Sequence, residues 1–159
     1  MPANAIQRLP LPVFTDVLEA AARIVPYARV TPVVRVPAID DLAGCEVHFK
    51  CEQFQHMGAF KFRGACNAVF SLGDVEAGRG VVTHSSGNHG AALAHAAKRR
   101  GIPCHVVVPE GAVAAKLANI QAQGAVLHRC EPTIAAREAM CTEVQAKTGA
   151  EVVHPYTDP

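Results

Sequence analysis

The sequence predicts an α/β fold in which a parallel sheet carries helices on both faces. From Val81 onward, short apolar runs alternate with longer stretches of helical periodicity, and the links between them are short. Strict strand–helix alternation of this kind is built from βαβ units, whose strands are parallel. A glycine follows each of three expected helices, where it can satisfy the end carbonyls; these are Gly101, Gly124 and Gly149.

The first part of the chain predicts a helix followed by extended segments. Residues 14–25 place apolar side chains on one helical stripe, with Thr15 as the expected N-cap and Pro26 closing the helix. Residues 46–51 alternate polar and apolar side chains as a half-buried strand does. We expect an extended piece at 31–36 and a turn or a single helical turn at 37–44.

The period changes after Gly58, where residues 59–71 suit a helix with Lys61 in its first turn. Residues 74–80 are polar and flanked by glycines, which predicts a loop. The remaining strands are expected at 81–84, 104–108, 125–129 and 151–154, and the helices at 88–100, 113–123 and 132–148.

Composition excludes several classes of protein. Half of the 159 residues are hydrophobic (50%) and the formal net charge is +1, with no basic run that would suit nucleic acid. No apolar run approaches the roughly 18 residues of a membrane-spanning helix. Prolines interrupt residues 1–10, where a signal peptide would need an apolar core.

Cysteine and histidine spacing gives no sign of a disulfide framework or a metal centre. The six cysteines form no Cys-x-x-Cys pair and are interpreted as reduced core residues of a cytoplasmic protein. His84 and His89 are the only close histidine pair, and they flank a turn instead of sharing a helix face. We therefore predict no metal site.

Lys61 lies between two phenylalanines in the segment Cys51–Cys66. Phe60 and Phe62 flank it, and an apolar setting disfavours an ammonium group relative to a neutral amine. Because a neutral amine attacks carbonyl groups, this lysine suits a Schiff base with an aldehyde cofactor such as pyridoxal phosphate. The alternative is an amphipathic helix whose Lys61 and Arg63 extend past core phenylalanines.

A second candidate segment, Val81–Ala94, runs from a strand through a Ser/Gly/Asn turn into an alanine-rich helix. Such a turn gathers backbone N–H groups and hydroxyls at the carboxyl end of a strand, where α/β proteins bind anions. An ordinary βα turn with Asn88 as N-cap would have the same pattern. No Gly-x-Gly-x-x-Gly or Walker spacing occurs, which argues against those nucleotide sites.

Together the two segments resemble the fold-type II pyridoxal-phosphate enzymes, which share the tryptophan synthase β-like fold. The resemblance is to their serine racemase and serine/threonine dehydratase (threonine ammonia-lyase) branch. Residues 58–65 are similar to the Schiff-base motif of that family, and residues 83–90 to its loop for the cofactor ring and substrate carboxylate. Both motifs occur in order and at the family separation, which makes the match specific. Shorter matches lie at residues 31–33, 49–52, 101–103, 106–109 and 130–132.

The resemblance implies pyridoxal 5'-phosphate as cofactor and assigns roles to three residues. Lys61 would bind the cofactor aldehyde and later act as the base that removes the substrate Cα proton. Phe60 would pack beside the cofactor, and Asn88 would hydrogen-bond its ring hydroxyl. From the residues alone, core packing for Phe60 and a helix cap for Asn88 stay open.

The same resemblance implies a substrate site and a second catalytic group. Ser86 would stand opposite the lysine, because inversion at Cα needs one proton-transferring group on each face. A turn serine is the alternative for Ser86, and a solvated helix residue is the alternative for Arg137. The implied substrate-binding residues are Ser85, Ser86, Asn88, His89 and Arg137.

Members of this family are about twice as long as the chain, so the resemblance implies an N-terminal portion and a C-terminally incomplete fold. We expect residues 1–53 to be N-terminal pieces of the large cofactor domain. Residues 54–154 would form the small substrate-side α/β domain, and residues 155–159 would begin the return to the large domain. The family's glycine-rich phosphate loop and the acidic ligands of its divalent-cation (Mg²⁺) site would lie beyond this chain.

The implied activity is β-elimination of L-serine or L-threonine to a 2-oxo acid and ammonia, with racemisation of serine beside it. One alternative is serine racemisation as the main activity. Another, of a different class, is a non-catalytic α/β fragment that serves binding or assembly. The implied partners are serine, threonine or 3-hydroxyaspartate and a second copy of the full-length chain, with no nucleic acid and no membrane.

Overall fold

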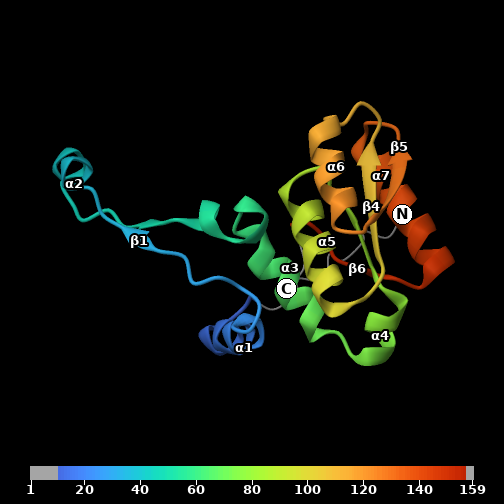
Figure 1. Cartoon of the computed structure of the whole chain (residues 1–159), viewed down its shortest axis with the longest axis horizontal. Helices are drawn as coiled ribbons and strands as arrows, with labels where there is room; N and C mark the ends of the chain where they lie inside the picture. The colour runs from blue at the N-terminus through green and yellow to red at the C-terminus, as the bar shows by residue number, and fades with distance from the viewer. Residues whose placement is uncertain (1–10, 157–159) are drawn as a thin grey trace, which may run out of the picture.

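A four-stranded parallel sheet organises the right-hand part of the molecule in Figure 1. The computed structural model of the chain describes residues 11–156. The strands are β3 (Val81–His84), β4 (Cys104–Pro109), β5 (Val126–Cys130) and β6 (Glu151–Val152), in the spatial order β5-β4-β3-β6. The α/β class and the parallel sheet are therefore confirmed.

The strand order reverses between β3 and β6, and this reversal places helices on both faces. The chain steps from β3 to β4 to β5 and then returns to pair β6 with the far side of β3. Because crossovers are right-handed, a return in the opposite direction puts its helix on the opposite face. Helices α5 (Asn88–Arg100) and α6 (Ala114–Ala122) thus cover one face and α7 (Ile134–Thr148) the other.

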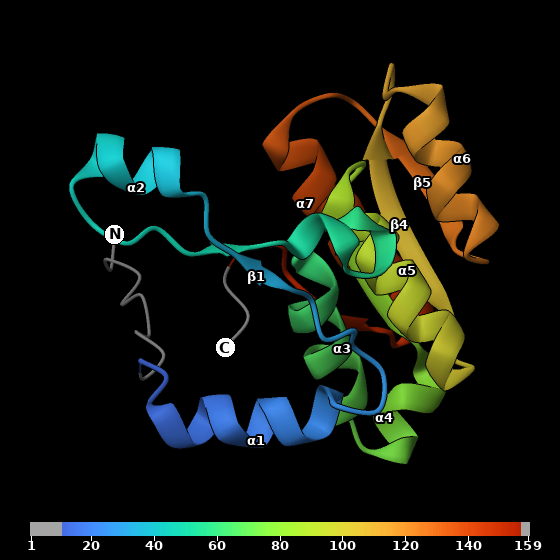
Figure 2. The ribbon, with the colours of Figure 1, turned by 60° about the vertical axis from the view of Figure 1, so that its left-hand side comes forward.

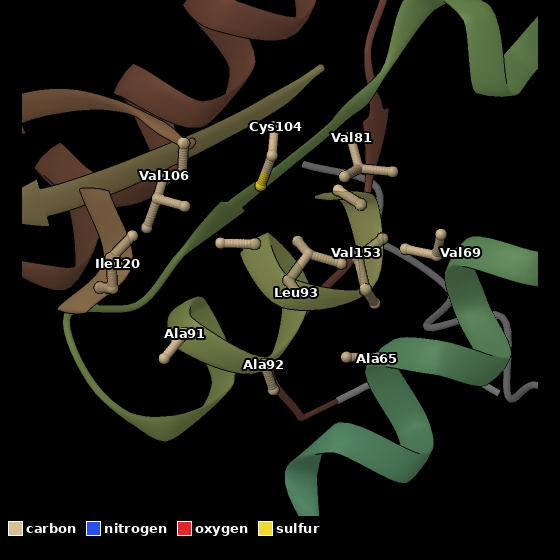
Figure 3. Close-up of a cluster of buried hydrophobic side chains, with 14 of the residues drawn as sticks. Ala65, Val69, Val81, Ala91, Ala92, Leu93, Cys104, Val106, Ile120 and Val153 are labelled. Carbon is tan, nitrogen blue, oxygen red and sulfur yellow. The ribbon is translucent and has the colours of Figure 1, made fainter. Parts of the chain in front are cut away.

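Side chains on opposite faces of the sheet pack into two separate hydrophobic cores. Val81 and Val106 pack with α5 (Figure 3), whereas their neighbours Val82 and Val107 pack with α7. Helix α3 (Lys61–Ser71) adds its own apolar stripe against α5, with Val69 fully buried. Each such side chain contributes about 1.5–3 kcal/mol by leaving water.

An N-terminal arm, residues 11–50, lies to one side of the sheet (Figures 1 and 2). The arm contains α1 (Phe14–Ile24), β1 (Val33–Val34), α2 (Pro37–Ala43) and β2 (Phe49–Lys50), none of which contains a buried residue. β1 and β2 pair with each other in antiparallel fashion. One contact between the arm and the rest of the chain is made where α1 packs on α3, and there Arg23 donates a hydrogen bond to Asn67.

The structure corrects several expectations for the first 80 residues. Residues 74–80 are not a loop: they contain helix α4 (Asp74–Arg79), whose acidic first turn and buried Ala77 stabilise it despite the glycines around it. The N-cap of α1 is Val13, not Thr15, because the Asp16 carboxylate accepts the Val13 N–H at 2.7 Å. The expected strand at 46–51 is reduced to β2, since β1 offers only two residues to pair with.

Other boundaries differ by small shifts. Asn88 is the first residue of α5 and Gly87 is its N-cap, so the alternative role of Asn88 as a cap is wrong. Helix α7 begins at Ile134, where the Thr133 hydroxyl accepts the Ala136 N–H at 3.1 Å. Helix α2 is longer than the expected single turn. The glycines expected after three helices do adopt positive φ; they are Gly101, Gly124 and Gly149.

Five of the six cysteines are buried, and Cys45 is the exposed exception to the expected core role. Burial raises the pKa of Cys104 to about 12 and of Cys66 to about 11, so both thiols stay protonated near neutral pH. Between residues 11 and 156, no helix has the length and apolar character needed to span a bilayer. The proline-interrupted start, residues 1–10, lies outside the described residues.

Candidate active site

The predicted site residues meet in one pocket at the point where the strand order reverses. All seven line a cavity of about 430 Å³ beside the carboxyl ends of β3 and β6. Open α/β sheets bind their ligands at such a reversal. The predicted residues brought together are Phe60, Lys61, Ser85, Ser86, Asn88, His89 and Arg137.

Lys61 is the first residue of α3, and its amine points to the segment that follows β6. Its Nζ donates a hydrogen bond to the Pro155 carbonyl oxygen at 2.7 Å. The same Nζ lies 5.6 Å from the ring centroids of both Phe60 and Tyr156. The Lys61 amine is therefore close to two aromatic rings and to one carbonyl oxygen that accepts its hydrogen bond.

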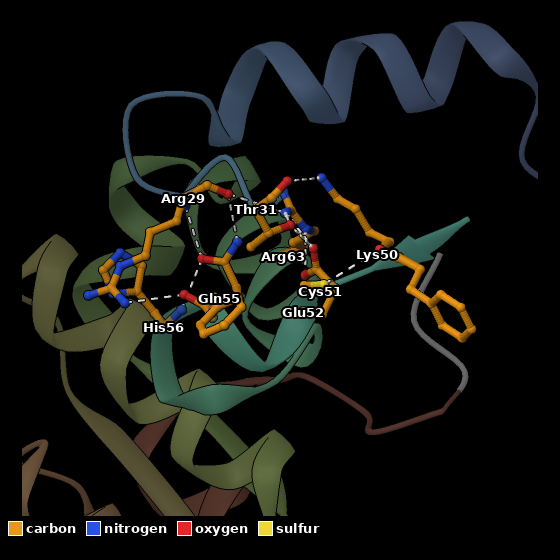
Figure 4. A network of polar contacts seen from close by, with 10 residues as sticks. Arg29, Thr31, Lys50, Cys51, Glu52, Gln55, His56 and Arg63 are labelled. Atoms are coloured by element: carbon orange, nitrogen blue, oxygen red, sulfur yellow. Dashed lines mark hydrogen bonds and ion pairs between the residues drawn. The ribbon is translucent and has the colours of Figure 1, made fainter. Parts of the chain in front are cut away.

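An ion pair two residues further along α3 holds this helix start in place. Arg63 donates to both carboxylate oxygens of Glu52, from Nε at 2.8 Å and from Nη2 at 2.7 Å (Figure 4). Thr31 adds a 2.6 Å hydrogen bond to the same carboxylate. Hydrogen bonding by Arg63 holds the pKa of the Glu52 carboxyl below its usual value. The network joins the N-terminal arm to the turn of α3 that carries Lys61.

The loop after β3 is tightly folded and presents free polar groups to the pocket. The hydroxyl of Ser85 accepts the Gly87 N–H at 3.3 Å. A Cβ on Gly90 would lie 2.1 Å from the Ser85 carbonyl oxygen, so only glycine fits there. The side chains of Ser86 and Asn88 make no hydrogen bond to any residue in the range 11–156. They are thus available to a ligand.

His89 reaches the pocket wall with a neutral ring. Its side chain is buried, and Nε2 lies 3.3 Å from the Val153 carbonyl oxygen. Since a carbonyl only accepts, this nitrogen carries the proton. Burial lowers the pKa of His89 to about 4. At neutral pH, His89 therefore offers an anion its backbone N–H at the start of α5, without a ring charge.

The sequence reasoning missed Lys116, which lines the same pocket from the first turn of α6. Arg137 occupies the matching place in the first turn of α7, where its Nε donates to the Thr133 carbonyl at 3.2 Å. In a parallel sheet, every helix after a strand begins at the carboxyl edge. That rule would have singled out Lys116 from the predicted element order.

A second cavity of about 440 Å³ lies beside the first, and Pro155 and Tyr156 line both. Arg63, Asn67 and Val153 are among its other lining residues. The two cavities share Lys61, so groups placed in either can reach its amine. The segment after β6, which was not predicted to belong to the site, forms part of their common wall.

Comparison with known proteins agrees with this geometry. The family described as "Pyridoxal-phosphate dependent enzyme" matches residues 24–159. The chain belongs to the pyridoxal-phosphate-dependent enzyme family. It is 49% identical over 149 residues to a beta-hydroxyaspartate dehydratase of Paracoccus denitrificans, covering 94% of this chain and 47% of that protein. It is also 49% identical over 143 residues to a serine racemase of Oryza sativa subsp. indica, covering 90% of this chain and 42% of the relative.

A solved structure shows the same arrangement. Maize serine racemase superposes with a TM-score of 0.87 at 47% sequence identity, over 91% of this chain and 44% of that one. The tryptophan synthase β-like, fold-type II arrangement expected for a pyridoxal-phosphate enzyme is thereby confirmed. The chain spans less than half the length of each of these relatives.

The residues of the pocket fit part of pyridoxal phosphate. The amine of Lys61 and the free amide of Asn88 both line the pocket. The loop that carries Asn88 is tightly folded, because Gly90 lies close to the Ser85 carbonyl. The Lys61 amine is the group that an aldehyde requires to form a Schiff base. The Asn88 amide can hydrogen-bond a ring hydroxyl. Lys61 and Asn88, with Phe60 in the same lining, would be the residues that hold the cofactor in this part of the protein.

Proposed function

We propose that the protein containing this chain removes the β-hydroxyl group of a hydroxy amino acid, releasing a 2-oxo acid and ammonia. Its substrates would be L-serine, L-threonine or 3-hydroxyaspartate. The observation that carries the proposal is the 430 Å³ pocket, which is lined by an amine, a polar loop and the first turns of four helices. Each of those features suits one part of such a substrate or its cofactor.

The loop and the helix starts suit the substrate carboxylate. Backbone N–H groups at the start of α5 favour an anion, and Ser85 lies directly before them. Bound pyridoxal phosphate supplies an electron sink for the charge left at Cα. Lys61 would act as the general base and take the Cα proton on its Nζ. This role requires the amine to reach the pocket, and Lys61 lines it.

Ser86 supports racemisation as a second activity. Its hydroxyl faces the pocket and has no partner within the described part of the chain. A hydroxyl group on the face opposite Lys61 could return a proton there, which inverts Cα. Replacement Ser86→Ala is expected to abolish racemisation and to leave β-elimination measurable.

Lys116 and Arg137 support an acidic substrate within the proposed range. Neither side chain forms an ion pair with a described residue, and no acidic residue lines the pocket. One of the two cations would balance the α-carboxylate of the substrate. The other cation would then be available to a β-carboxylate such as that of 3-hydroxyaspartate. The proposal therefore includes dicarboxylic substrates.

The proposal assigns the chain to one part of a larger enzyme. Residues 54–154 would be the substrate-side domain, and residues 1–53 would complete a cofactor domain with chain beyond residue 159. That further chain would supply the phosphate loop and any Mg²⁺ ligands. A homodimer in the cytoplasm is the proposed form of the whole protein.

The test is covalent trapping on the full-length protein. Incubation with pyridoxal phosphate and borohydride, followed by peptide mapping, should give one adduct, on Lys61. Lys61→Ala should lose both the adduct and 2-oxo acid release from serine, threonine and 3-hydroxyaspartate, whereas exposed Lys147→Ala should keep both. Adducts scattered over many lysines, with no 2-oxo acid released, would instead favour the non-catalytic alternative.

A further inference from the structure

Two histidines lie close together at one edge of the sheet: His84 ends β3, and His154 lies two residues beyond the end of the neighbouring strand β6. β3 and β6 are in register with Val81 opposite Glu151 and Val82 opposite Val152. Continuing that register by two residues sets His84 beside His154, and their ring centroids are 5.0 Å apart at an interplanar angle of 75°. Because side chains alternate along an extended chain, His84 lies on the α7 side with Val82, and His154 lies there with Val152.

Helix α7 brings a carboxylate to these two rings. Its buried residues Cys141 and Val144 pack on Val82 and Val107, which fixes the helix over this face. Glu138 lies about one turn before Cys141 on the same helix. One ligand atom each from His84, Glu138 and His154 lies within 4.8 Å of the other two.

The most buried member of this cluster lacks a hydrogen-bond partner. His84 is 8% exposed, and its Nε2 is buried without a partner among residues 11–156. An unsatisfied buried nitrogen is unfavourable. A metal ion would satisfy it, because a ring nitrogen lone pair is a good ligand for first-row transition metals.

We propose that His84, Glu138 and His154 bind a divalent transition-metal ion, with Zn²⁺ as the best match. Two imidazoles and a carboxylate are a frequent zinc set that leaves a position for water. Ligand atoms around one zinc ion lie about 3.4 Å apart, given metal–ligand distances of about 2.0–2.1 Å. The exposed side chain of Glu138 can close the remaining distance by turning about its own bonds.

The ion would stand in the wall between the two cavities. His84 lines the 430 Å³ pocket and His154 the 440 Å³ one. The His154 Nδ1 accepts the Tyr156 N–H at 3.2 Å, so an ion bound at Nε2 would move a proton to Nδ1 and release that contact. The site is thus separate from Lys61 but adjoins the segment that hydrogen-bonds it.

The experiment is equilibrium dialysis of the full-length protein against Zn²⁺ in excess Mg²⁺, which would fill the Mg²⁺ site proposed above, with Co²⁺ as a spectroscopic probe of the ligands. We expect one ion per chain and a Co²⁺ visible spectrum typical of nitrogen and oxygen ligands. Glu138→Gln and His154→Gln should each weaken binding by roughly 100-fold or more, since even outer-shell changes weaken metal sites 10–100-fold.

His128→Gln is the matched control. His128 belongs to the other histidine pair of the sheet, with Nε2 3.1 Å from the His105 Nδ1, and its replacement should leave the affinity unchanged. Absence of saturable binding at one ion per chain would overturn the proposal. So would binding that survives Glu138→Gln and His154→Gln, or binding that His128→Gln removes.

Discussion

Phe60 and Phe62 lie on either side of Lys61 and face opposite environments. Phe60 is 61% exposed at the pocket, whereas Phe62 is fully buried and contacts His56 and His95 edge-on, at centroid distances of 4.8 and 5.4 Å. The amine therefore extends from a helix turn with one neighbour, Phe62, in the core and the other, Phe60, in the pocket lining.

This difference predicts two distinct mutant phenotypes. Phe62→Ala should lower the free energy of unfolding by about 3–5 kcal/mol, because it leaves a cavity in the core. Phe60→Ala should change it by less than about 1 kcal/mol and weaken cofactor capture instead. Urea denaturation and a pyridoxal-phosphate titration measure the two effects, and equal destabilisation by both replacements would contradict this division of roles.

Gly90→Ala is expected to damage the loop after β3. The added Cβ would lie 2.1 Å from the Ser85 carbonyl oxygen and 3.2 Å from the Val106 side chain, so the backbone must shift at a cost of about 3 kcal/mol. Gly78→Ala in α4 meets no atom within 4 Å and should stabilise by about 0.5–1 kcal/mol. Thermal unfolding of the two variants gives the comparison, and a stable Gly90→Ala protein with full activity would refute the expectation.

Lys116→Ala tests which substrates the pocket prefers. For a dicarboxylic substrate, loss of one cation should raise KM by roughly tenfold, about 1.4 kcal/mol, while kcat changes little. For serine, which has one carboxylate, KM should change far less. Initial rates of 2-oxo acid release with 3-hydroxyaspartate and with serine measure this ratio. An equal effect on both substrates would mean that Lys116 binds the shared α-carboxylate.

The pair His105 and His128 predicts a pH dependence of stability. Burial, followed by the charge of His128, lowers the pKa of His105; burial, followed by the charge of Lys147, lowers that of His128. Since the unfolded chain then binds more protons below its ordinary histidine pKa of about 6.5, the free energy of unfolding should fall as pH drops below that value. His128→Gln should flatten this decline, and exposed His48→Gln should not; identical pH profiles for both variants would contradict the prediction.

Sequence reasoning succeeded where local pattern and motif determine the outcome. The alternation of strands and helices after Val81, together with the two motifs, identified the fold. The seven predicted site residues all line one pocket. It failed where long-range packing decides. Helix α4 depends on burying Ala77, and β2 ends where β1 has no further residue to pair with. His154 comes to lie beside His84 only through the strand order, which no local window contains.

The first turns of α3, α5, α6 and α7 contribute residues to the lining of the 430 Å³ pocket, and three of these residues are cations: Lys61, Lys116 and Arg137. Their combined field acts on an anion before any contact is made, and it draws the anion from solution toward the opening. The encounter rate for a carboxylate or phosphate should therefore fall steeply with added salt, because the screening length shortens from about 10 Å at 0.1 M to about 3 Å at 1 M. How quickly ligands arrive is thus set by the same parallel strand order that brings the helix starts to one edge.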